Sequence, residues 1–197
     1  MARLPYPSRD AMPVETADLL NGLPRNNITE MLAHAPSLAE PFLRMAQAQF
    51  TALELSDRQR ELVILAVSGL VECDYEYVQH VPISAAAGIV ADLRDRVRGG
   101  DFDAPDDPGE RAMLAFVAAV VRAPRMTDEV FATTRRHLTD RQIVEVLQLV
   151  GFYWGVARMS TCSNSNSTFP KVWSRSPRWP PWIADRTRSA RRWVEIA

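Results

Sequence analysis

The sequence predicts an all-α protein, and two observations carry that prediction. Apolar residues recur at helical spacing in one segment after another between residues 38 and 160. No Val-, Ile- and Thr-rich segment alternates with polar residues between turn signals, as strands would. With 197 residues, of which 47% are hydrophobic, the chain can form one ordinary globular domain with extensions.

The first three predicted helices have clear boundaries. An amphipathic helix is expected over residues 38–53. The next begins after Ser56, which forms a capping box with Gln59, and its apolar residues lie nearly all round, which predicts deep burial. A very short joint at residues 71–72 leads to a third helix over 73–87, which Gly88 ends.

Four further helices are predicted, over residues 89–97, 110–122, 127–137 and 143–159. A loop rich in Asp and Pro separates the first two, and Thr127 caps the third. The Leu-Thr-Asp-Arg-Gln that starts at Leu138 repeats in kind the Leu-Ser-Asp-Arg-Gln that starts at Leu55. An internal duplication and a shared capping box both account for this repeat, and both explanations stay open.

The chain divides into three predicted regions: an N-terminal extension over 1–37, a helical domain over 38–160 and a C-terminal arm over 161–197. Residues 1–24 hold four prolines and little periodicity, so we expect an extended lead-in. The arm carries four of the five tryptophans together with prolines that forbid a long helix. We expect it to be ordered and irregular, and to pack on its own or a neighbouring subunit.

Composition argues against several classes of protein. The net charge is −1, and although the arm has seven basic residues against two acidic ones, the rest of the chain is acidic, which disfavours nucleic acid as a partner. No apolar run approaches the ~18–20 residues that span a bilayer, and the N-terminus lacks the core of a secretory signal. Two cysteines are too few for a disulfide framework, so we expect a cytoplasmic protein without membrane attachment.

One cluster of residues has the composition of an active site. Cys73, Glu76 and His80 have the spacing i, i+3 and i+7, which puts a thiol, a carboxylate and an imidazole on one face of the predicted helix. Two helices joined so briefly pack antiparallel, which brings Glu61 beside His80. A carboxylate there orients the imidazole and raises its basicity.

This pattern resembles the signature of the carboxymuconolactone decarboxylase / alkylhydroperoxidase D-like superfamily. Eleven residues separate Glu61 from Cys73, two separate Cys73 from Glu76, and three separate Glu76 from His80. The resemblance extends over roughly residues 38–160 and implies that family's helical bundle, with the short-joined helix pair at its catalytic centre. Its redox members have a second cysteine where this chain has Glu76, so the resemblance argues against a Cys-x-x-Cys peroxidase cycle.

The resemblance therefore implies an enzyme that works by acid–base chemistry without a cofactor. We expect a lyase (decarboxylase) or isomerase acting on a small lactone or carboxylic acid, with His80 as acid or base, Glu76 as its partner and Glu61 as the orienting group. Tyr75 or Tyr77 would bind a substrate oxygen. One alternative is a Cys73-dependent antioxidant of peroxiredoxin type, and another is a non-catalytic oligomeric binding protein.

Two further expectations follow from the residues and the resemblance. Glu61, Glu76 and His80 are a conceivable set of metal ligands, but a single histidine and the metal-free family precedent make us expect no metal. The precedent also implies a bacterial-type homo-oligomer, trimeric or hexameric, in which pockets lie between subunits.

Overall fold

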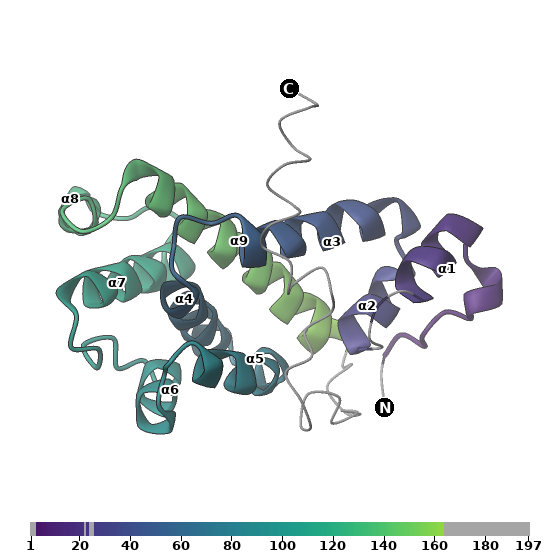
Figure 1. Ribbon diagram of the computed structural model, residues 1–197, viewed down its shortest axis with the longest axis horizontal. Coiled ribbons are helices and arrows are strands. Elements are labelled where there is room, and N and C mark those ends of the chain that lie inside the picture. The colour runs from purple at the N-terminus through teal and green to yellow at the C-terminus, as the bar shows by residue number, and fades with distance from the viewer. Residues whose placement is uncertain (1–2, 22, 24–25, 164–197) are drawn as a thin grey trace. The chain divides into compact units, whose positions relative to one another are not determined.

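The computed structural model describes residues 3–21, 23 and 26–163, and all of their regular elements are helices (Figure 1). This confirms the all-α prediction. The described residues form two compact units. One contains the residues up to 53 together with those from 159 onward, and the other contains residues 54–158. Most of the predicted arm, from residue 164 onward, lies outside the described residues.

The first unit shows that one expectation was wrong. Residues 1–24 do not form a wholly extended lead-in, because the 3₁₀ helix η1 (Arg9–Ala11) and helix α1 (Val14–Asn21) form within them. Thr16 and Leu20, one turn apart on α1, are both buried. Helix α2 (Asn27–Leu32) begins at a capping box between Asn26 and Thr29, and α3 (Pro36–Thr51) starts with a proline in its first turn.

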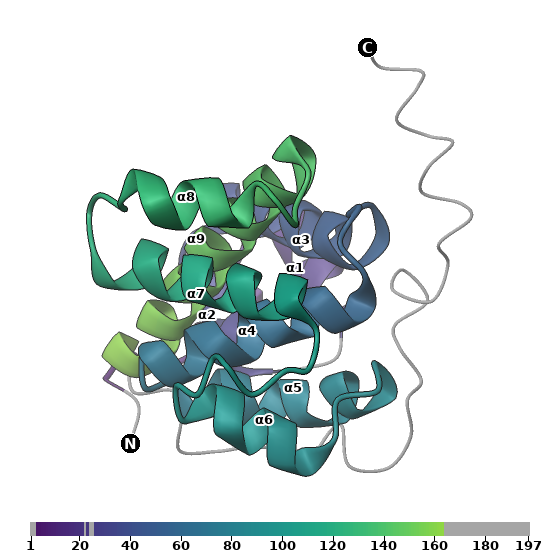
Figure 2. The same cartoon turned by 90° about the vertical axis from the view of Figure 1, so that its left-hand side faces the viewer.

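Helix α4 (Asp57–Leu70) is the buried centre of the second unit. The capping box forms as predicted, since the Gln59 amide N–H donates to Ser56 Oγ at 3.1 Å and the Ser56 N–H donates to Gln59 Oε1 at 3.0 Å. The six residues from Leu62 to Val67 are each at most 1% exposed, with α5, α6 and α7 packed around the helix (Figure 2). The prediction that this helix is deeply buried is confirmed.

The joint between α4 and α5 (Asp74–Ala86) reverses the chain within three residues. Glu72 adopts the left-handed conformation, with φ of 55°. The Cys73 N–H donates to the Ser68 carbonyl at 2.9 Å, which closes the end of α4. After α5, Gly88 takes φ of +79°, a conformation that suits glycine at a helix end.

Four more helices complete this unit: α6 (Ala91–Arg98), α7 (Pro108–Arg122), α8 (Asp128–Thr134) and α9 (Asp140–Ser163), which continues into the first unit. Two contacts hold α9 alongside α4. The Glu145 carboxylate accepts the backbone N–H of Leu55 at 3.0 Å, and Arg158 donates to the Val71 carbonyl at 2.7 Å. Since these contacts lie at the start and the end of α4, the two helices run in the same direction.

Gly69 is where α4 and α6 approach most tightly, and its replacement by alanine is expected to be strongly destabilising. A Cβ there would lie 2.1 Å from the Arg98 carbonyl oxygen, so one backbone must move. We expect Gly69→Ala to lower the free energy of unfolding by about 3 kcal/mol in chemical denaturation. Gly155→Ala is the matched control: nothing lies within 4 Å of its Cβ, and helix propensity predicts a gain of about 0.5–1 kcal/mol. Equal stabilities for the two variants would contradict this packing.

Candidate active site

The site is built around a fully buried pair, Glu61 on α4 and His80 on α5. Glu61 is 0% exposed and His80 is 5% exposed. His80 Nδ1 lies 2.8 Å from Glu61 Oε2, a charge-assisted hydrogen bond in which the imidazole N–H donates to the carboxylate. The antiparallel joint thus places Glu61 beside His80, as the sequence indicates. This bond leaves Nε2 as the ring nitrogen that faces away from Glu61.

The guanidinium of Arg60 offsets the free-energy cost of burying the Glu61 carboxylate. Arg60 is itself buried, and its Nε donates to Glu61 Oε1 at 3.0 Å. Its Nη1 donates to the exposed carboxylate of Asp57 at 2.8 Å. Each Glu61 oxygen therefore has its own donor, which satisfies the usual requirement that buried charges are paired and hydrogen-bonded.

Glu76 lies on the other side of the imidazole. Its Oε2 is 3.8 Å from His80 Nε2, beyond hydrogen-bonding distance, and the residue is only 4% exposed. Burial raises the pKa of the Glu76 carboxyl from 4.5 to about 7, while His80 lowers it and Glu61 raises it further by smaller amounts. At neutral pH this carboxyl is therefore partly protonated, so it can both give and take a proton.

The raised pKa of Glu76 predicts a loss of stability as pH rises. The unfolded chain releases this proton near pH 4.5 and the folded chain only near pH 7, so between these values the folded state binds more protons. Raising the pH through this window should lower the free energy of unfolding by about 3 kcal/mol. In denaturation curves of Glu76→Gln, measured from pH 4 to 8, this fall in the free energy of unfolding should be absent. Parallel stability profiles for the two proteins would contradict the assignment.

Tyr153 on α9 completes the site, and its role is not evident from the sequence. Its ring stands edge-on to His80, with centroids 5.2 Å apart and planes at 85°, and the residue is 5% exposed. Burial raises the pKa of its hydroxyl well above 10, and the charges of Glu61 and Glu76 raise it further. From the sequence alone, Tyr153 is expected to be a core residue. The one sequence feature that could have pointed to it is the Gly-Phe-Tyr-Trp run that ends at Trp154.

The other predicted site residues, Cys73, Tyr75 and Tyr77, are buried and show no contact with the imidazole of His80 among the interactions described above. Cys73 is 1% exposed at the N-cap of α5, and Cys162 is exposed near the end of α9. Tyr75 is buried at 3% exposure. The Tyr77 hydroxyl donates to Asp95 on α6, and the Arg98 guanidinium lies 4.1 Å from the centre of its ring, so Tyr77 joins α5 to α6.

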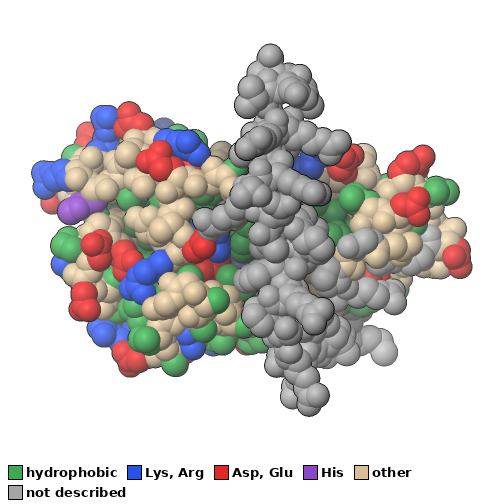
Figure 3. Space-filling view, viewed as in Figure 1, with side chains coloured by type: hydrophobic (Ala, Val, Ile, Leu, Met, Phe, Trp, Pro, Cys, Tyr) green, Lys and Arg blue, Asp and Glu red, His purple; other side chains and the backbone are tan. Residues whose placement is uncertain are grey.

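A metal-binding cluster, a membrane-spanning helix or a large charged patch on the surface would each indicate another kind of function. Among the described residues, no three His, Cys, Asp or Glu side chains form a metal-binding cluster. Within the same residues, no helix is long and apolar enough to cross a membrane. On the face shown in Figure 3, acidic and basic side chains are interspersed over the described surface without a large patch of one sign.

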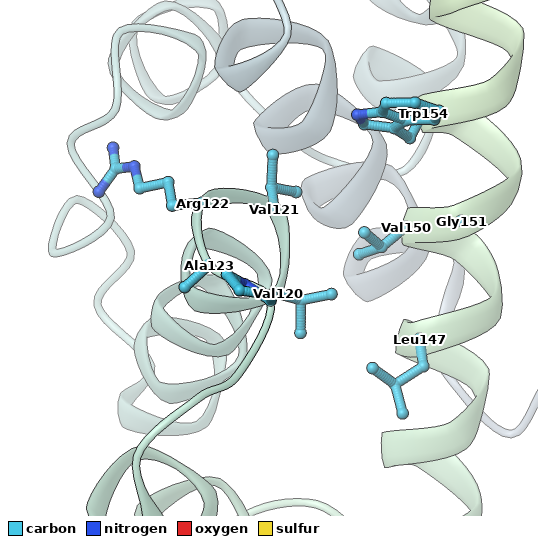
Figure 4. A pocket seen from close by; sticks show the side chains of 9 residues that line it. Val120, Val121, Arg122, Ala123, Leu147, Val150, Gly151 and Trp154 are labelled. Carbon is cyan, nitrogen blue, oxygen red and sulfur yellow. The ribbon is translucent and has the colours of Figure 1, made fainter.

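A separate hollow of about 480 Å³ lies between the end of α7 and the middle of α9 (Figure 4). Its lining is mostly apolar and includes Val120, Leu147 and Trp154. Arg122 is the one charged residue of the lining, and its side chain points away from the residues of α9. This hollow therefore lacks the proton-transfer groups that gather at His80.

Comparison with solved structures defines the class of fold. The alkylhydroperoxidase D core protein from Ralstonia eutropha JMP134, described as an uncharacterized peroxidase-related protein, matches with a TM-score of 0.72 and 24% identity over 83% of this chain and 90% of that one. A peroxidase-related protein from Silicibacter sp. TM1040 matches at 0.71 and 23%, over 83% and 90%. The debrominase Bmp8 matches at 0.65 and 17%, over 78% and 88%. No curated protein sequence matches this chain.

These matches show an alkylhydroperoxidase D-like fold. Residues 36–119, which include Glu61, Cys73, Glu76 and His80, match the model of the carboxymuconolactone decarboxylase family. These residues are therefore similar to that family, and the fold around them is the one seen in alkylhydroperoxidase D-like structures.

Proposed function

We propose that this protein is an acid–base enzyme that protonates a carbanion formed next to a carbonyl group, acting as a lyase or isomerase on a small lactone or carboxylic acid. One observation carries the proposal: His80 is held between Glu61, which bonds its Nδ1, and Glu76, which faces its Nε2 with a pKa near neutrality. Because a fold by itself does not fix a reaction, the proposal rests on this arrangement.

The proposed reaction needs no group beyond the site and the substrate. In a carboxylated unsaturated lactone, the bond to the carboxylate breaks, its electron pair passes into the conjugated carbonyl, and carbon dioxide leaves. The neutral Glu76 carboxyl gives its proton to His80 Nε2, and Nε2 passes that proton to the carbanion carbon. Glu61 accepts the Nδ1–H throughout and stabilises the imidazolium that forms in transit. The Glu76 carboxylate then takes up a proton from water.

The sequence motif also favours acid–base chemistry over the thiol alternative. Glu76 occupies the position at which the redox proteins of the similar family have their second cysteine. A thiol cycle at Cys73 would therefore need a partner thiol from elsewhere in the chain.

Deuterium incorporation tests the proposal. We would incubate the protein in D2O with carboxylated butenolides and 3-oxo acids, and follow the carbon next to the carbonyl by NMR. The expected result is release of carbon dioxide or exchange of a C–H for deuterium with at least one member of the panel, strongly reduced in Glu76→Gln. Absence of incorporation from the whole panel, with a correctly folded protein, would sink the proposal.

A further inference from the structure

We infer that Tyr153 is a catalytic residue: its hydroxyl donates a hydrogen bond to the substrate oxygen that becomes negatively charged when the carbanion forms. The inference rests on the proposed function and adds to it the group that binds the enolate oxygen. Tyr153 lies outside both the residues that match the family model, 36–119, and the motif from Glu61 to His80.

The first support is the position of the ring. Tyr153 meets His80 edge-on with ring centroids 5.2 Å apart, so its ring lies directly against the imidazole that transfers the proton. The charges of Glu61, Glu76 and Arg60 all act on that hydroxyl. The contacts that hold α9 beside α4, at Glu145 and Arg158, fix the helix on both sides of Tyr153. A donor held by rigid helices is what stabilisation of a developing charge requires.

The second support is the state of the hydroxyl. A buried tyrosine usually donates its O–H to a partner, yet Tyr153 makes no hydrogen bond to any residue in the part of the chain that the structure describes. Tyr77, three residues before His80, shows the contrasting case, because its hydroxyl is engaged by Asp95. The raised pKa of Tyr153 keeps it a neutral donor at every physiological pH.

Tyr153, His80 and Glu76 would each have a separate role in the reaction of an enolate. Bond cleavage at carbon moves an electron pair onto the carbonyl oxygen, where the Tyr153 O–H lowers its energy without transferring its proton. His80 delivers the proton to the carbon, and the electron pair returns from the oxygen to complete the new C–H bond. A phenol together with a neutral carboxylic acid is a known kind of oxyanion hole, and protonated Glu76 can assist Tyr153 in this way.

The test combines turnover with binding of 4-nitrophenol, whose phenolate form is a stable oxyanion. Tyr153→Phe removes only the hydroxyl, and it should lower kcat for the best substrate of the deuterium panel by about 10²-fold. The same variant should bind 4-nitrophenolate about tenfold more weakly, read from phenolate absorbance. Trp154→Phe, at the exposed neighbouring position that faces the α7–α9 hollow, should leave both values unchanged.

The outcomes separate this inference from the proposed function. If Tyr153→Phe binds 4-nitrophenolate as tightly as the native protein, or if the native protein does not bind it, the inference is overturned. If the deuterium panel shows no turnover while phenolate binding depends on Tyr153, the proposed reaction falls and the oxyanion site stands. Near-UV circular dichroism checks that each variant keeps its packing.

Discussion

Glu61→Ala is expected to lower the free energy of unfolding by about 3–5 kcal/mol, because it removes a buried carboxylate that two buried side chains bond. The lost carboxylate accepts from Arg60 at 3.0 Å and from His80 at 2.8 Å, and both partners are buried. Without Glu61, the guanidinium loses the buried acceptor of its Nε, while the exposed Asp57 still accepts from its Nη1. Urea denaturation at pH 7 measures the effect.

Asp57→Asn is the matched control for this prediction. It removes a second carboxylate that Arg60 contacts, but the Asp57 side chain is 48% exposed. Exposed ion pairs contribute at most about 1 kcal/mol, so this variant should stay close to the native protein in stability. If Glu61→Ala were no less stable than Asp57→Asn, the buried Arg60–Glu61–His80 chain would not have the energetic role assigned to it.

His80→Gln should lower kcat by about 10²- to 10⁴-fold while leaving the fold intact. The glutamine amide can still donate to the Glu61 carboxylate, which keeps that buried charge paired, but it cannot take up or release a proton. His137→Gln, at an exposed histidine in the same unit, is the control and should retain full activity. Unchanged turnover in His80→Gln would remove the imidazole from the mechanism.

The centre of the site was predictable because its determinants are local. A joint of three residues between α4 and α5 forces an antiparallel pair, and counting back from the turn places Glu61 at His80. The capping box at Ser56 is likewise a short-range pattern, and it forms as expected. Such features follow from hydrogen-bonding groups within a few residues of one another.

The rest depends on contacts between residues distant in sequence. Tyr153 is 73 positions after His80, and nothing near it indicates that α9 lies along α4. Tyr77 is a plausible substrate donor by sequence, but the packing of α6 on α5 brings Asp95 to its hydroxyl. Helix α1 was missed because the surrounding prolines dominate the local pattern, while its stability comes from burial of Thr16 and Leu20.

The measurement that tests the central claim most directly is deuterium incorporation by two variants, His80→Gln and Cys73→Ser, on the substrate that the native protein turns over. An acid–base centre predicts that Cys73→Ser retains the deuterium-labelled product and that His80→Gln loses it. Loss in Cys73→Ser together with retention in His80→Gln would contradict the account and assign the chemistry to the thiol.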